Sequence, residues 1–192
     1  QDKAAVDRIV AGLIDKTRGD RELLSLLTAK DGAAARNIAM NGEMVLRSDE
    51  EITKRLEALR ANVDELRTAA GGDKCVFDIA MGQLKRLGGK ALPSGTITQI
   101  VDLTAKADVS ALKGLSAKSS ASALTKAMCA MDRIVTDICG KTQVMKNFGF
   151  SMAAEGSTVN SMIMGLVFAR MDARSLNGIK AQVNLEAKLR GY

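Results

Sequence analysis

The chain has 192 residues, 46% of them hydrophobic, which is enough for one domain with a buried core and excludes a disordered composition. It contains no histidine, so the commonest general base, the usual metal ligand and every Ser–His or Cys–His nucleophile pair are excluded within it. The net charge of +6 lies mostly in the second half, because residues 1–92 carry 16 basic and 15 acidic side chains and residues 93–192 carry 12 and 7.

Aromatic residues make up only 3% of the chain, and there is one proline, Pro93. A core without aromatic rings must be aliphatic, here with ten methionines, and scarce proline favours long uninterrupted helices. The composition therefore predicts an all-α fold, which we expect to be an antiparallel bundle of about six to eight helices with an aliphatic and methionine-rich core.

Three stretches with the pattern of amphipathic helices begin the chain, and the first of them has its apolar residues at spacings of three and four. Asp2 is positioned to cap the first helix, and Gly19 to end it. Asp20 and Gly32 are placed in the same way around a second helix. A third helix is expected over residues 33–47, although Gly42 inside it is an unfavourable helix residue.

The sequence "SDEE" at 48–51 is the clearest local signal in the chain. It matches a capping box, in which the Ser48 hydroxyl accepts from the backbone N–H of Glu51. A heptad-like apolar seam follows, and Gly71 ends it. We therefore predict a surface helix with one narrow apolar stripe, made of Ile52, Leu56, Leu59, Val63, Leu66 and Ala70.

The next helix is expected over residues 73–87, followed by the loop "GGKALPSG" at 88–95. We expect a single helical domain over residues 1–192, and any boundary between subdomains should fall in this loop. The loop also lacks the glycine and lysine spacing of a phosphate-binding loop, so we interpret it as a plain connection.

The stretch beginning at Thr96 is rich in β-branched residues and is open to two interpretations, a short strand or a helix capped by Ser94 or Thr96. We favour the helix because its apolar residues have helical spacing. After a featureless segment at 116–125, a long helix is expected to end at Gly140. Its predicted inner face consists of Leu124, Met128, Met131, Val135 and Ile138.

The most apolar segment is "STVNSMIMGLVFARMDAR", residues 157–174. Its uncharged apolar run, 162–169, is far shorter than the ~20 residues of a membrane-spanning helix. We predict a helix that begins at Ser157 or Thr158 and runs to about Leu176, with a stop at 177–178 and a last helix over 179–189. The apolar residues of the helix that begins at Ser157 or Thr158 cover more than half of its circumference, which is typical of the central helix of a bundle. A helix with one face in a subunit contact and a membrane-inserted helix remain the alternatives.

The three cysteines suggest no metal site, because no two of them form a C-x-x-C pair. Cys129 and Cys139 share a predicted helix about 15 Å apart along its axis, so they cannot bond to each other. If the protein is exported, Cys75 with Cys129 or Cys139 is the candidate disulfide. The alternative is three reduced thiols that are buried as small apolar residues.

These features predict a non-catalytic interaction or assembly protein with no cofactor and no metal. The start at Gln1 and the methionine-rich helix favour an exported subunit of a larger structure, such as a bacterial surface or secretion apparatus, forming a homo-oligomer or larger assembly. Cytoplasmic and virion locations are the alternatives to a periplasmic, extracellular or surface one. The candidate interaction residues are Met162, Ile163, Leu166, Val167, Arg170 and Arg174.

A second hypothesis is a helical coat protein that packages nucleic acid through its basic C-terminal half. Against it, the basic residues are scattered, and the aromatic side chains that stack on single-stranded bases are scarce. The cations that would contact phosphates are Lys106, Lys113, Lys118, Lys126, Arg133, Arg170 and Arg174.

Overall fold

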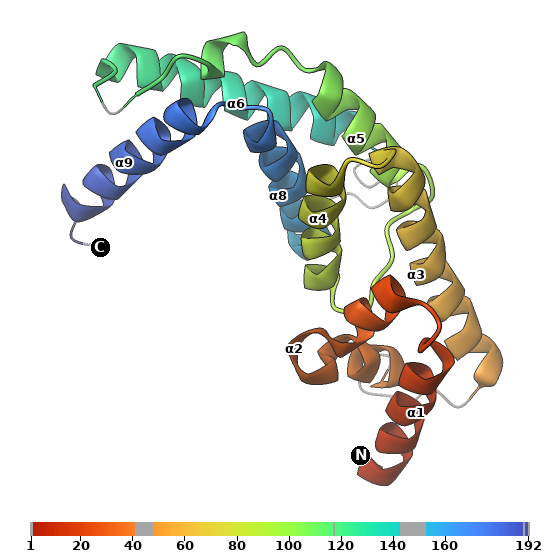
Figure 1. The fold of residues 1–192 in the computed structure, drawn as a ribbon. Coiled ribbons are helices and arrows are strands. Elements are labelled where there is room, and N and C mark those ends of the chain that lie inside the picture. The colour runs from red at the N-terminus through yellow and green to blue at the C-terminus, as the bar shows by residue number, and fades with distance from the viewer. Residues whose placement is uncertain (1, 41–47, 117, 143–152, 190, 192) are drawn as a thin grey trace.

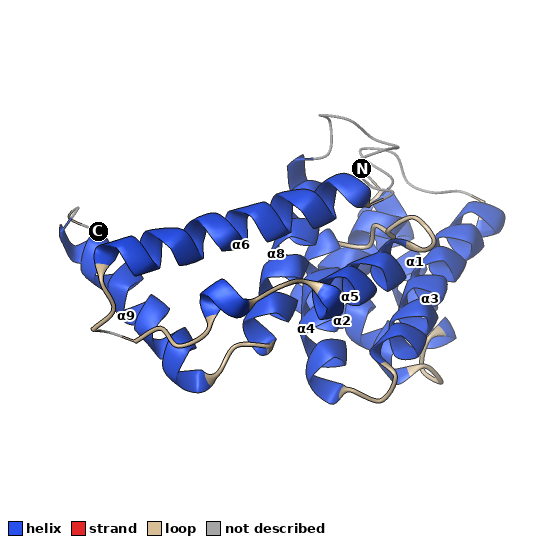
Figure 2. Ribbon diagram, turned by 90° about the horizontal axis from the view of Figure 1, so that it is seen from above, coloured by secondary structure: helices blue, strands red, loops and turns tan. Residues whose placement is uncertain are grey.

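The computed structural model describes residues 2–40, 48–116, 118–142, 153–189 and 191. Every regular element in these ranges is a helix and none is a strand, as the sequence predicts (Figure 2). Eight α-helices and two short 3₁₀ helices lie in the described ranges and pack as a bundle (Figure 1). The buried core is aliphatic and includes three methionines, Met81, Met162 and Met171.

The first two helices, α1 (Lys3–Lys16) and α2 (Arg21–Met40), pack against each other at the N-terminal end of the molecule. Their predicted N-terminal caps are confirmed, whereas α1 ends at Lys16, with Thr17 in the capping position, and not at Gly19. The carboxylates of Asp2 and Asp20 each accept a backbone N–H bond from three residues further on, at 3.1 and 3.0 Å. These bonds satisfy N–H groups that the first turn of a helix leaves without partners.

The predicted helix end at Gly32 is wrong, because α2 continues through it to Met40. Lys30 and Gly32 have left-handed φ values of +49° and +76°, so the glycine marks a distortion inside the helix. Buried residues on both sides of the distortion hold the two parts on one core: Leu23, Leu26, Leu27, Ala35 and Ile38. The rest of the expected third helix, residues 41–47, lies outside the described residues.

Helix α3 (Asp49–Ala70) confirms the capping box, since the Ser48 hydroxyl accepts from the Glu51 N–H at 3.1 Å. Gly71 ends the helix in the left-handed conformation, which glycine adopts without steric cost. The predicted seam is also confirmed. All six of its members are buried: Ile52, Leu56, Leu59, Val63, Leu66 and Ala70.

The helix predicted over residues 73–87 is present as α4 (Lys74–Leu84) followed by the 3₁₀ helix η1 (Lys85–Leu87). Asp73 caps it by accepting from the Val76 N–H at 3.2 Å. Residues 88–95 then form the predicted connection, whose role as a subdomain boundary stays a prediction.

That connection is fixed to α3 through Asn62, which is buried at 4% exposure. The Asn62 amide donates to the Leu92 carbonyl at 2.9 Å and accepts from the Leu92 N–H at 2.7 Å. A side chain on one helix thus satisfies both backbone groups of a buried loop residue, which would otherwise be costly to bury.

The segment after the loop is helix α5 (Thr96–Lys106), so the helical interpretation is confirmed over the strand. The predicted caps, Ser94 and Thr96, are wrong. Gly95 occupies the capping position, and the carboxylate that binds the first turn comes from Glu65 on α3. It accepts from the N–H groups of Gly95 and Thr98, at 2.5 and 3.2 Å. The loop brings α5 alongside α3, so a distant acid replaces the local hydroxyl.

A second 3₁₀ helix, η2 (Ser110–Leu112), leads toward the long helix α6 (Ala121–Lys141). Figure 2 shows α6 running from the body of the molecule out to the C-terminal helix. The predicted inner face is buried only at Ile138 and half-buried at Leu124, Met131 and Val135, while Met128 is 59% exposed. The predicted inner position of Met128 is wrong, because at this end of α6 the buried position is that of Ala127, which is 1% exposed. The helix also passes through Gly140 to Lys141.

The boundaries predicted for the apolar segment are wrong. Helix α8 (Ala153–Ala169) begins before Ser157, and α9 (Ala173–Leu189) begins where α8 was expected to continue. The Asp172 carboxylate accepts from the Ser175 N–H at 2.7 Å, which makes it a start signal for α9. The predicted stop at Gly178 is wrong, since α9 continues through it. Gly178 instead permits close packing, because a Cβ atom there would lie 2.6 Å from the backbone of Ser116.

The interpretation of α8 as the central helix agrees with the observed packing. It contacts α4, α5, α6 and η1, and lies among them in Figure 1. A Cβ atom on Gly165 would lie 2.9 Å from Cγ2 of Ile79, so the glycine permits close contact with α4. The residues of α8 that are buried on several sides are Thr158, Val159, Met162, Ile163, Leu166 and Val167.

Candidate interaction surface

The four apolar candidates for an interaction site, Met162, Ile163, Leu166 and Val167, all lie in the core of the chain itself. None is more than 3% exposed. Burying a large aliphatic side chain stabilises the fold by roughly 1.5–3 kcal/mol. In the folded chain these side chains hold α8 in the core and are not exposed at the surface.

The two basic candidates beside them differ from each other. The Arg170 guanidinium donates to the backbone carbonyls of Thr104 and Ala107, at 2.6 and 2.7 Å. These carbonyls lie at the C-terminal end of α5, where a positive charge also favours the helix dipole. Arg170 therefore joins the end of α8 to α5, whereas Arg174 is exposed on the first turn of α9.

Residues 118–130 and helix α9 form a projection that we call the arm. Figure 1 shows both parts extending from the body of the molecule on the same side. Met128, on α6, is the most exposed large apolar side chain among the described residues. Helix α9 makes only sparse contacts with the other helices described, in contrast to α8.

Helix α9 is held to the chain near its beginning. The Ser175 hydroxyl accepts from the Leu115 N–H at 3.1 Å and donates to the Asp172 carboxylate at 2.8 Å. The hydrogen bonds from the Ser175 backbone N–H and hydroxyl lower the pKa of Asp172. Together with the contact between Gly178 and Ser116, they hold the first turns of α9 in place.

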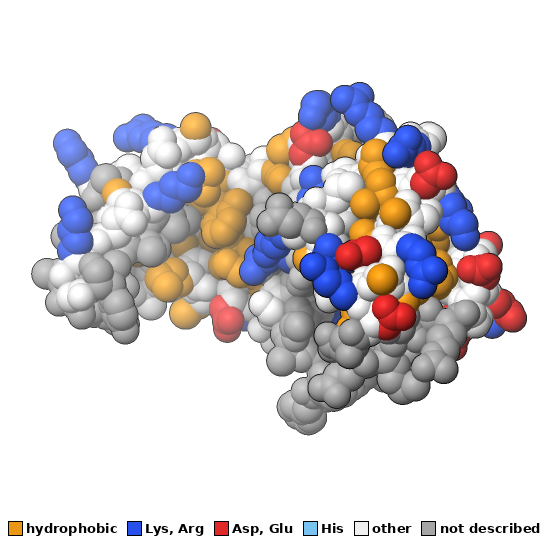
Figure 3. All heavy atoms as spheres, turned by 90° about the horizontal axis from the view of Figure 1, so that it is seen from below, with side chains coloured by type: hydrophobic (Ala, Val, Ile, Leu, Met, Phe, Trp, Pro, Cys, Tyr) orange, Lys and Arg blue, Asp and Glu red, His pale blue; other side chains and the backbone are white. Residues whose placement is uncertain are grey.

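The arm is strongly basic. Its sequence contains five cations and a single carboxylate, that of Glu186. The five cations are exposed, and none forms an ion pair in the described part of the chain: Lys118, Lys126, Arg174, Lys180 and Lys188. Figure 3, seen from below, shows basic side chains along the arm at the left, whereas basic and acidic side chains are mixed over the body at the right.

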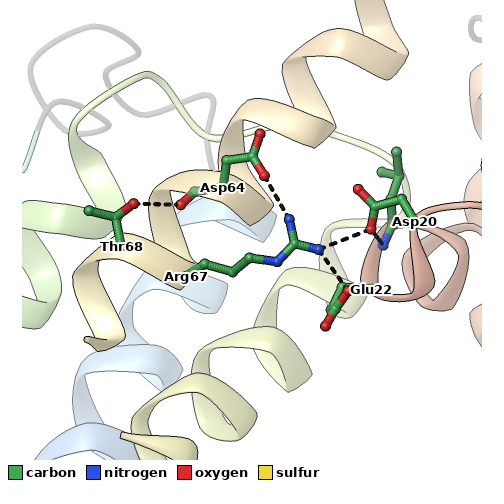
Figure 4. A network of polar contacts seen from close by, with 6 residues as sticks. Asp20, Glu22, Asp64, Arg67 and Thr68 are labelled. Atoms are coloured by element: carbon green, nitrogen blue, oxygen red, sulfur yellow. Dashed lines mark hydrogen bonds and ion pairs between the residues drawn. The ribbon is translucent and has the colours of Figure 1, made fainter. Parts of the chain in front are cut away.

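The body contains a polar cluster centred on Arg67 of α3 (Figure 4). Its guanidinium pairs with Asp20, Glu22 and Asp64, at 3.1, 2.7 and 2.7 Å. The hydrogen bond from Arg67 lowers the pKa of the Glu22 carboxyl. Because these pairs link the start of α2 to α3, we interpret the cluster as a structural contact between helices.

The three thiols are free in the structure, with Cys75 and Cys129 exposed and Cys139 buried. Neither candidate disulfide, Cys75 with Cys129 or Cys75 with Cys139, is formed. Burial raises the pKa of the Cys139 thiol, which disfavours the reactive thiolate. Within the described residues, no group of three or more Cys, Asp or Glu side chains is placed to hold a metal ion.

The described helices include none that is long and apolar enough to span a membrane. No protein-family model, curated protein or solved structure matches the chain.

The sequence did not predict the arm, because the exposure of these residues depends on how the other helices pack. The charge signal was visible, since four of its five cations lie in stretches without carboxylates. Met128 has the same spacing as buried residues of α6, so periodicity alone assigns it to the inner face. Of the seven cations considered for phosphate binding, Lys106 is paired with Asp102 and Arg170 is used by α5.

Proposed function

We propose that this chain is a non-catalytic helical interaction protein that works as an exported subunit of a larger assembly and uses its arm as a contact surface. The observation that carries the proposal is the sparse packing of α9 on the other described helices. Helices in proteins owe most of their stability to the packing of one face against other elements. A partner that packs on the arm would supply the contacts that the chain itself does not.

The exposed side chain of Met128 supports the same surface. Methionine is flexible and polarizable, and it is common at surfaces that adapt to a partner. Around it the five cations of the arm favour a partner with an acidic face and would speed its association. Catalysis has no role in the proposal, because the chain contains no histidine to act as a general base.

The test is the mass of the full chain in solution, measured by sedimentation over a range of concentrations. We expect the wild-type protein to self-associate as its concentration rises, and Met128→Glu to shift this equilibrium strongly toward the monomer. Thr136→Glu, at an exposed position of α6 outside the arm, is the matched control and should behave as wild type. A protein that stays monomeric throughout, or equal effects of both variants, would argue against the arm as a self-association surface.

The second candidate function, nucleic-acid packaging, is favoured by one observation, the excess of exposed cations over carboxylates on the arm. Phosphate contacts of lysine and arginine release counterions, so such binding weakens steeply as salt rises. A titration of single- and double-stranded oligonucleotides at several salt concentrations tests this candidate. Tight binding whose salt dependence falls in Lys126→Ala and Lys180→Ala would favour packaging over protein assembly.

A further inference from the structure

A groove lies between α5 and α6, on residues outside the arm. Its volume is about 620 Å³, within the range of protein binding sites. The apolar part of its lining comes from two pairs of residues. Leu103 and Ala107 lie at the end of α5, and Ile134 and Ile138 lie on α6.

Each pair is spaced by four residues, which places its two members on one face of a helix. Two short apolar ridges therefore border the groove, one on each helix. All four side chains belong to or pack against the hydrophobic core, so the ridges are supported from beneath. A third helix can lie between two such ridges, with its own side chains in the space between them, as helices do throughout bundles.

The rim of the groove carries cations on both walls, Lys106 on α5 and Arg133 and Lys141 on α6. Lys106 pairs with Asp102 at 3.1 Å, and Lys141 pairs with Asp137 at 3.0 Å. Both are exposed pairs within a single helix, a class of ion pair that contributes little and exchanges easily for another carboxylate. Arg133 is exposed and has no ion pair in the described part of the chain.

The two carboxylates of the lining are both engaged within the chain. Asp137 binds Lys141, and Asp108 accepts from the backbone N–H of Ser110 at 3.0 Å. Hydrogen bonds with the Ser110 side chain and backbone N–H lower the pKa of Asp108, and the positive charge of Arg170 adds to this effect. The charge left to meet a ligand is therefore positive, with Arg133 the most available group.

We propose that this groove binds an amphipathic helix of a partner protein, with apolar side chains seated between α5 and α6 and carboxylates placed beside Lys106 and Arg133. The apolar ridges favour a helix as the ligand, and the cationic rim favours an acidic one. The inference rests on the proposed role as an interaction protein, but it requires no self-association through the arm.

The probe is a fluorescent synthetic helix of about 18 residues, or five turns, with a leucine stripe flanked by glutamates. One matched peptide replaces every glutamate by lysine, and a second replaces the leucines by serine. Binding to the full chain is followed by fluorescence anisotropy at low and physiological salt. The protein variants are Arg133→Glu and Lys106→Glu, and the control is Lys126→Glu, on the same helix as Arg133 but outside the groove.

The expected result is saturable binding of the acidic peptide with a Kd below about 1 mM, and no saturation with either matched peptide. Each groove variant should weaken binding about tenfold or more, while Lys126→Glu leaves it within about twofold. Circular dichroism confirms that the variants are folded. Equal binding of the lysine peptide, equal effects of the three variants, or no saturable binding would overturn the proposal.

A second copy of the chain is the other possible occupant. Sedimentation of the wild-type protein and Arg133→Glu distinguishes it: a self-association that Arg133→Glu abolishes would overturn the proposal in favour of that occupant. Self-association that depends on Met128 alone, with no binding of the acidic peptide, would refute the groove as a binding site but support the proposed function.

Discussion

The buried contact between Asn62 and Leu92 offers a sharp test of how the structure is held together, through the substitution Asn62→Ala. It removes a hydrogen bond to the Leu92 carbonyl at 2.9 Å and one from the Leu92 N–H at 2.7 Å. Leaving a buried polar group without a partner costs about 1–3 kcal/mol. Two such groups give an expected loss of about 2–6 kcal/mol, a large share of the roughly 5–15 kcal/mol by which a domain is stable.

The matched control is Asn37→Ala. The Asn37 amide also donates to a loop carbonyl, that of Gly88 at 3.0 Å, but it does so at the exposed surface. Water can replace this bond, so a loss below about 1 kcal/mol is expected. Urea unfolding followed by circular dichroism measures both variants. A loss in Asn62→Ala no greater than that in Asn37→Ala would refute the reasoning, because burial would then not decide the cost.

Three further predictions concern stability. Leu166→Asp places an unpaired charge in the core and should abolish cooperative thermal unfolding. Met164→Asp, at an exposed position of α8, should retain it. Equal behaviour of the two variants would contradict the placement of Leu166 in the core. Arg67 lowers the pKa of Glu22, so this contact stabilises the fold above the ordinary glutamate pKa of about 4.3, and the contribution is lost as pH falls through the lower folded-state value. Acid titration should therefore cost the wild-type protein slightly more stability than Glu22→Gln. Glu65→Ala should lose about 0.5–2 kcal/mol in urea unfolding through the missing cap of α5, and a loss near zero would contradict that role.

The helices predicted best are those whose signals are local. The capping box at Ser48 and the glycine at position 71 bracket α3 in the sequence, and the structure places both ends there. Ser48 and Gly71 act on neighbouring backbone groups, so their effect does not depend on contacts with distant parts of the chain. The same holds for Asp2 and Asp73 at the starts of α1 and α4.

The predictions failed where distant contacts decide the outcome. Gly178 looked like a helix end, but its missing side chain serves the close approach to Ser116. Glu65, thirty residues earlier in the chain than Gly95, replaces the cap expected from Ser94 or Thr96. The residue pattern of one segment cannot predict such contacts, because they form only when the chain folds.

The sequence failed to predict the groove for the same reason. Its apolar residues on α5 and α6 have the helical spacing of core residues, and the sequence gives no sign that they border an open space. The charged rim was equally hidden, since Lys106 and Arg133 are twenty-seven positions apart and come together only when α5 and α6 pack. The sequence predicted helical faces, and the pairing of those faces required the structure.

The central claim is that the chain is a subunit of a protein assembly. Its most direct test is the mass of the protein purified from its native source under mild conditions, measured together with its ultraviolet absorbance spectrum. The account predicts a mass several times that of one 20.3 kDa chain and a spectrum free of nucleic acid. A monomer of 20.3 kDa without partners, or nucleic acid that copurifies and is released by salt, would contradict it.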